Sequence, residues 1–204
     1  MHKTLSTLAL AALLGLGLSS VASAQSRDFQ IRNDGGSRIQ FVSDAPLETI
    51  TGVSSHVTGS VSLDPSNLSA ARGTINVRVA SIRTGIDLRD EHLRSDNWLG
   101  AGANPNATFE ITRVEGASSL QPNQSTRVRL HGRFSIHGVT HDIVANAQVR
   151  LIPASHESVE TDTIRAQASF RIRLTDYNVS IPLPVRLKVS NEIRVNVAIR
   201  AVAG

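Results

Sequence analysis

IRAQASFRIRL, residues 164–174, alternates apolar and polar side chains without a break. The even-numbered positions hold Ile, Ala, Phe or Leu, and the odd-numbered positions hold Arg, Gln or Ser. Successive side chains of a β-strand point to opposite faces, so this pattern predicts a strand with one buried and one solvated face. Burial of a single face is typical of antiparallel sheets.

The same alternation recurs along most of the chain. It is clear over residues 74–79, 127–136 and 193–201, and weaker over 28–32, 38–42, 47–53, 57–63, 108–115 and 143–151. Turn-forming residues stand between several of these stretches, at 34–36, 64–67, 121–123 and 137–138. A sheet of about eight such strands closes on itself, because closure removes the unpaired edges. The sequence therefore predicts an all-β chain that forms a single antiparallel barrel.

The apolar faces of these strands predict the barrel interior. The residues expected to point inward are Phe41, Ile75, Val77, Phe109, Phe134, Ile136, Phe170 and Ile172. A small barrel either fills with side chains or holds one small ligand. Gly132, Ala166 and Ala168 are small and favour an elongated apolar cavity that is widest beside them, whereas Phe134 and Phe170 favour a filled interior. The strand pattern leaves both interpretations open.

One charged segment interrupts the strands and predicts a short helical insert near residues 87–98. In the simpler interpretation it is a surface helix, capped by Asp87, whose apolar side chains close one end of the core. In the alternative it is a lid at the entrance of a ligand cavity. Leu88, Leu93 and Trp98 would then shape the entrance, and Arg89, His92 and Arg94 would donate hydrogen bonds to a polar head group.

Residues 1–24 have the features of a secretory signal peptide. Lys3 precedes an apolar run over 5–18, and Ala22-Ser23-Ala24 forms a cleavage site before Gln25. We therefore expect export to the periplasm and a mature domain of residues 25–204. No other apolar run approaches the length of a membrane span, so no transmembrane anchor is expected. The sequence has no cysteine, which excludes disulfides and thiol catalysis.

Composition argues against several classes of function. The net charge is +4, but the arginines are dispersed along the strands and aromatic residues make up only 3%, so we expect no nucleic-acid binding. His137 and His141 flank Gly138 in a predicted turn, where their spacing does not indicate a metal site. No cofactor motif or nucleophile motif is present, and no cofactor is expected.

Three segments also carry a family resemblance. Residues 80–95 read ASIRTGIDLRDEHLRS and continue through Trp98 into NPNATF at 104–109; residues 132–140 read GRFSIHGVT, and residues 170–177 read FRIRLTDY. Together they resemble the signatures of the YceI-like family, also called polyisoprenoid-binding proteins, over about residues 38–201. Two features depart from the family pattern. Residues 37–48 lack the histidine that members often carry, and Asn178 stands where they have glycine.

The resemblance implies a lipocalin-like barrel with a long apolar cavity, in an exported carrier of isoprenoid quinones, polyprenyl chains or fatty-acid derivatives. It also implies a possible homodimer. We therefore expect a non-enzymatic, periplasmic lipid carrier whose partner is an isoprenoid or fatty-acyl lipid. The predicted ligand-binding residues are Phe41, Ile75, Val77, Leu88, Arg89, His92, Leu93, Arg94, Trp98, Phe109, Phe134, Ile136, Phe170, Ile172 and Tyr177.

Two other functions stay open at this point. One is a structural or stress-response barrel with a filled core that acts through a protein partner. The other, weaker, is a lipid-modifying enzyme that uses His92 and Asp90 as acid and base.

Overall fold

The computed structural model describes residues 25–156 and 159–204, so the signal peptide predicted for residues 1–24 lies outside the described residues. Ten β-strands, one α-helix and three short 3-10 helices follow one another within these ranges. In chain order they are β1 (Arg27–Ile31), β2 (Arg38–Asp44), β3 (Thr49–Ser54), β4 (Val57–Asp64), β5 (Asn67–Arg78), η1 (Val79–Ser81), α1 (Asp87–Arg94), β6 (Asn106–Glu115), β7 (Ser125–Ile136), β8 (Val139–Ile152), β9 (Thr163–Arg173), η2 (Leu174–Tyr177), η3 (Leu183–Val185) and β10 (Glu192–Ala203).

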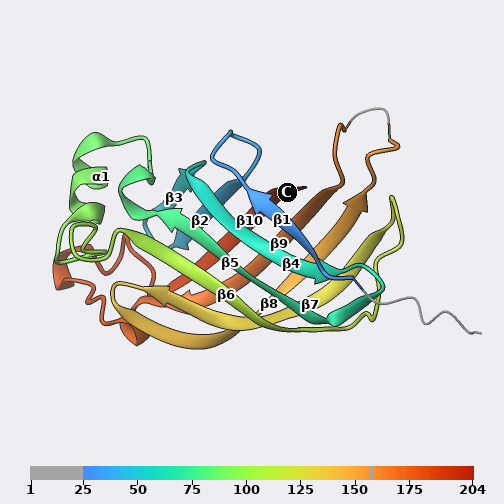
Figure 1. The fold of residues 1–204 in the computed structure, drawn as a ribbon. Helices are drawn as coiled ribbons and strands as arrows, with labels where there is room; N and C mark the ends of the chain where they lie inside the picture. Colours follow the sequence, from blue (N-terminus) through green and yellow to red (C-terminus); the bar gives the residue numbers. More distant parts are fainter. Residues whose placement is uncertain (1–24, 157–158) are drawn as a thin grey trace, which may run out of the picture.

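The strands form one closed antiparallel barrel (Figure 1). Closure is made by β1, which pairs with β4 on one side and with β10 on the other, where Phe29 lies opposite Ala203. β2 also pairs with β10, further along the same edge, so that β1 and β2 act as one interrupted strand. β3 and β4 pair with β2 and β1 in the same way. The ten strands therefore occupy eight positions around the barrel, which confirms the predicted fold.

The two ends of the barrel differ. Figure 1 shows α1 and the segment that holds η2 and η3 at one end, together with the turn between β2 and β3. The opposite end carries the turn between β4 and β5 and the loop between β6 and β7. We call the α1 end the mouth and the opposite end the base.

Two clusters of buried apolar residues lie inside the barrel. Leu63, Leu68, Leu120 and Leu151 belong to the cluster that reaches the base. The second cluster lies at the mouth end and is built around Val79, Leu99, Phe134, Tyr177 and Val179.

The helical insert differs in two details from the sequence prediction. The helix ends at Arg94 instead of continuing to residue 98, because Ser95 adopts an extended ψ of 163° and its hydroxyl donates to the carbonyl of His92 at 2.7 Å. Asp87 is not the capping residue: Ile86 occupies that position, and no side chain caps the helix. Asp87 lies in the first turn, where a carboxylate interacts favourably with the helix dipole.

Candidate functional site

An apolar cavity of about 520 Å³ runs through the barrel. Its lining extends from Leu63, Leu68 and Leu120 near the base to Leu88 and Lys188 at the mouth, so the cavity is elongated along the barrel axis. Sites for small molecules usually have volumes of about 300–1,000 Å³ and mostly apolar walls. The volume and the walls of this cavity therefore suit a narrow apolar ligand.

Nearly all polar side chains of the lining lie at the mouth. They are Ser43, Glu48, Thr84, Arg89, His92 and Lys188. Towards the base the walls consist of Ala, Val, Ile, Leu and Phe. A ligand with one polar end and one long apolar end would therefore be oriented with its polar end at the mouth.

A chain of hydrogen bonds fixes α1 over the mouth. The carboxylate of Asp90 is buried and accepts from the backbone N–H of Thr84 at 2.8 Å and from its hydroxyl at 2.6 Å. The Thr84 hydroxyl in turn accepts from Nε of Arg89 at 2.9 Å. Arg89 then pairs with Glu48 at 2.6 Å, which links α1 to the turn between β2 and β3. Arg89 is therefore held in place by Thr84 and Glu48 of the protein itself.

His92 and Lys188 are the two cavity-lining bases without a side-chain partner among the described residues. Both side chains are exposed and lie on different segments, His92 on α1 and Lys188 just after η3. Lys188 was not predicted from the sequence. The only feature of the sequence that distinguishes Lys188 is that it is the sole lysine beyond residue 24.

All predicted ligand-binding residues except Arg94 and Tyr177 line the cavity. The four lining residues of the helix, Leu88, Arg89, His92 and Leu93, are spaced three and four apart and share one face. Arg94 follows this face by one residue and is absent from the cavity lining, so its role as a polar group of the mouth stays a prediction. Whether the lining residues contact a ligand stays a prediction.

Tyr177, also predicted to bind the ligand, lies in the buried core at the mouth end and does not line the cavity. It is 2% exposed and packs edge-on against Phe134, with ring centroids 5.7 Å apart. The short helix η2 turns this side chain inward, which the alternation of the preceding strand could not reveal. Burial raises the pKa of the Tyr177 hydroxyl to about 12, and the nearby Asp176 adds to the shift.

The interior aromatic residues narrow the cavity without filling it. Phe134 and Phe170 pack edge to face at 5.2 Å, and Phe109 stacks on Phe170 at 6.2 Å. The ring of Phe109 lies where a Cβ of Gly132 would be, at 2.6 Å, so the cavity is not widened beside Gly132 as expected. Ala166 and Ala168 do line the cavity.

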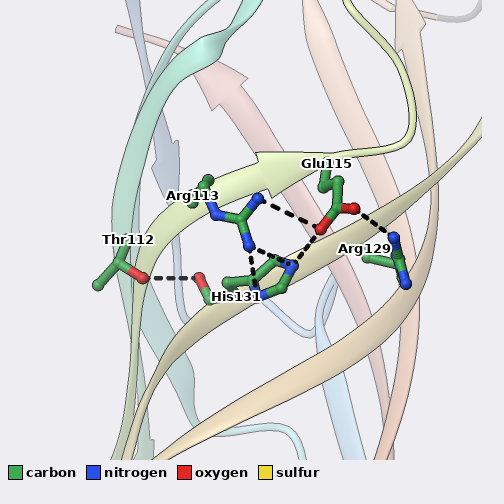
Figure 2. A network of polar contacts seen from close by, with 5 residues as sticks. All are labelled: Thr112, Arg113, Glu115, Arg129 and His131. Atoms are coloured by element: carbon green, nitrogen blue, oxygen red, sulfur yellow. Dashed lines mark hydrogen bonds and ion pairs between the residues drawn. The ribbon is translucent and has the colours of Figure 1, made fainter.

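The densest polar network of the outer wall lies on β6 and β7 (Figure 2). Glu115 pairs with Arg113, Arg129 and His131, and the hydrogen bond from His131 is the main cause that lowers the pKa of the Glu115 carboxyl. These groups lie outside the cavity and pair with one another. No group of three or more potential metal ligands occurs among the described residues.

A second hollow, of about 840 Å³, lies against the outer wall over β7 to β10 and β2. Its outward side chains are polar and include Arg38, Gln40, Arg127, Gln148 and Gln167. This hollow lies on the outer wall among polar side chains and is more open than the interior cavity, whose walls are almost entirely apolar. The interior cavity is therefore the candidate site.

These features define a closed antiparallel β-barrel with an elongated apolar cavity inside it. The model of the YceI-like domain matches residues 29–201, and the chain belongs to that family. A UPF0312 protein of Azotobacter vinelandii is 32% identical over 151 residues, which are 72% of this chain and 73% of the relative. A UPF0312 protein of Pseudomonas paraeruginosa is 26% identical over 185 residues, which are 90% of each chain.

Solved structures share the fold. BcnA of Burkholderia cenocepacia has a TM-score of 0.67 at 18% identity and covers 84% of this chain and 99% of its own. A polyisoprenoid binding domain from Saccharophagus degradans, implicated in plant cell wall breakdown, has a TM-score of 0.65 at 18% identity, with 88% and 100% covered. None of the helices in the described part of this chain is long and apolar enough to cross a membrane.

Proposed function

We propose that this protein is a periplasmic carrier that holds an isoprenoid lipid, of the polyprenyl or quinone type, or a long acyl chain in its barrel. The observation that carries the proposal is the elongated apolar cavity whose polar side chains gather at one end. The polyisoprenoid binding domain among the structures that share the fold supports a lipid-binding role. The predicted signal peptide supports export, and a periplasmic fraction that contains the protein would test it.

The free energy of such binding comes mainly from the burial of apolar surface. Each methylene that leaves water contributes about 0.8 kcal/mol, so a chain along the cavity is stabilised without any catalytic group. His92 and Lys188 can donate to a phosphate, a carboxylate or a quinone carbonyl at the mouth. These contacts would set the orientation of the ligand rather than most of its affinity.

We expect binding without turnover. The chain has no cysteine, and the Asp90 carboxylate that an acid–base mechanism would use is buried against Thr84. His92, the other candidate, has no carboxylate partner to orient it among the described residues. A general acid or base needs such a geometry before its pKa matters.

Lipids extracted from the purified protein and identified by mass spectrometry test the proposal most directly. We expect a long-chain isoprenoid or acyl lipid. An empty protein that also fails to take up a fluorescent isoprenoid analogue would instead support the structural barrel acting through a protein partner.

A pair of substitutions tests whether the ligand lies in the cavity. Ala168→Leu adds volume to the cavity wall and should lower the affinity for the fluorescent analogue about tenfold or more. The added side chain occupies the space of roughly two ligand carbons. Ala198→Leu is the matched control, since Ala198 is exposed on the outer face of β10. Equal affinities of the two folded variants would contradict the assignment of the interior cavity as the ligand site.

Trp98→Ala tests whether the mouth contributes to ligand binding. Trp98 is the only tryptophan and lines the cavity, so its fluorescence also reports occupancy in the unmodified protein. We expect weaker binding of the analogue to the folded variant. Unchanged affinity would mean that Trp98 only closes the core.

A further inference from the structure

Exposed apolar side chains gather around the mouth. Six large hydrophobic residues are exposed among those described, and five of them are Leu47, Ile86, Leu88, Leu183 and Leu187. The sixth, Val144, lies on β8. Single exposed leucines are ordinary on a protein surface, but a concentration at one opening marks an interaction site.

These five residues, which we call the rim, come from three segments that border the cavity. Ile86 and Leu88 themselves line it, and Leu47 precedes the lining residue Glu48. Leu183 and Leu187 flank Val185, which also lines the cavity. Leu183 is 74% exposed and Leu47 is 67% exposed, so these two side chains of the rim lie mostly in water.

The backbone holds the rim outward. The N–H of Leu47 donates to the carbonyl of Leu187 at 2.9 Å and joins two of the three segments. The carbonyl of Val185 accepts from the N–H groups of Lys188 and Val189, each at 2.9 Å, which closes a tight turn around Leu187. The leucines of this turn therefore project from a structured surface.

The charge of the segment over residues 181–189 indicates which kind of surface the rim binds. Arg186 and Lys188 are exposed on either side of Leu187, and the segment contains no acidic residue. Leucine interspersed with basic residues suits the boundary of an anionic bilayer, where the apolar side chains enter the acyl region and the cations meet the head groups. Acidic residues stand beside the rest of the rim, Asp87 and Glu91 on α1 and Glu48 next to Leu47, so the 181–189 segment is the part of the rim that would insert.

We propose that the rim docks on the surface of an anionic lipid bilayer, with the mouth of the cavity facing the membrane. The rim is continuous with the cavity wall through Leu88 and Val185, so a docked barrel would offer a lipid an apolar path that avoids water. This path rests on the proposed carrier function. The docking itself does not need a cavity ligand and can be tested without one.

Co-sedimentation with vesicles of equal parts phosphatidylglycerol and phosphatidylcholine tests the docking. The full mature chain should bind these vesicles more strongly than vesicles of phosphatidylcholine alone. Leu183→Asp and Leu187→Asp should each weaken binding about tenfold, because each removes an apolar side chain that the docked protein would bury in the bilayer. Val144→Asp is the matched control, an exposed apolar residue away from the rim, and should bind as the unmodified protein does.

The same variants separate docking from the carrier function. Leu183 and Leu187 do not line the cavity, so uptake of a water-dispersed isoprenoid analogue should be unchanged when vesicle binding is lost. Absence of vesicle binding by the unmodified protein would overturn the docking proposal and leave the carrier proposal standing. An equal loss in Val144→Asp, or a dimer that Leu187→Asp separates and that binds no vesicles, would also overturn it.

Discussion

Tyr177 places a hydroxyl in the core without a hydrogen-bond partner in the described structure. The segment around it is held by two histidines: Nδ1 of His137 donates to the carbonyl of Tyr177 at 3.0 Å, and Nε2 of His141 donates to that of Asp176 at 2.8 Å. The ring itself contacts Phe134 and His141 edge-on. The ring stabilises the mouth end of the core, whereas its unpaired hydroxyl opposes that stabilisation.

Replacing Tyr177 with Phe should therefore raise the free energy of unfolding by about 1 kcal/mol, because an unpaired buried polar group costs roughly 1–3 kcal/mol. The substitution keeps the ring contacts. Urea unfolding of the two proteins measures the difference. A loss of stability of similar size would show that a bound water satisfies the hydroxyl.

Single residues also show where sequence reasoning succeeds and fails. Alternation placed Phe41, Ile75 and Phe170 on the cavity wall, since orientation in a strand follows from position alone. It could not place Tyr177, which ends the 3-10 helix η2 that follows β9. It also could not reveal that the Phe109 ring covers Gly132, because that contact crosses between strands.

Asn178 stands where the family pattern has glycine, and its backbone conformation explains why asparagine is tolerated there. Its φ of 57° and ψ of 25° lie in the left-handed region. Glycine, which the resemblance places there, adopts this conformation freely, and asparagine is among the few other residues that tolerate it. The substitution therefore leaves the turn after η2 intact.

At the scale of elements, α1 depends on contacts with the rest of the barrel. It has eight residues, and helices of this length are marginal in water on their own. The buried carboxylate of Asp90 supplies the anchor through its two hydrogen bonds with Thr84. The sequence predicted that a helix lies here, but not its anchor, because Thr84 lies outside the helix.

Asp90→Ala should lower the free energy of unfolding by about 2 kcal/mol, since it leaves the Thr84 N–H without its acceptor. It should also speed the hydrogen exchange of the α1 amides more than that of the barrel strands. Asp90→Asn is the control and should have a smaller effect, because one Asp90 oxygen accepts both bonds and the amide retains an oxygen. Unchanged exchange in α1 of the alanine variant would contradict the anchoring role.

At the scale of the whole molecule, stability depends on the seam between β1 and β10. Asp162 supports this seam: its side chain pairs with Arg27 of β1 at 2.5 Å, and its carbonyl accepts from the N–H of Ala203 of β10 at 2.8 Å. The backbone N–H of Ala154 donates to the same carboxylate at 2.7 Å and is the main cause that lowers the pKa of Asp162. Arg27 lowers it further.

Asp162→Asn should reduce the free energy of unfolding by about 1 kcal/mol at neutral pH. Because the folded pKa of Asp162 lies below its unfolded value of about 3.9, its ionised form contributes fully above about pH 4. That contribution is lost as the pH falls through the folded pKa. Urea unfolding over a pH series should therefore show the two proteins converging in strongly acidic solution, and a constant difference at all pH values would contradict the assignment.

The pairing of Phe29 with Ala203 has a consequence for how the protein acquires its cavity. The contact joins the two ends of the described chain, so its loop-closure entropy is among the largest in the fold. Topologies with such distant pairings fold slowly. During synthesis, β1 has no partner on its β10 edge until β10 emerges. The enclosed cavity therefore comes into existence only when this late pairing forms, and the proposed carrier function requires that a lipid is loaded at that step or after it.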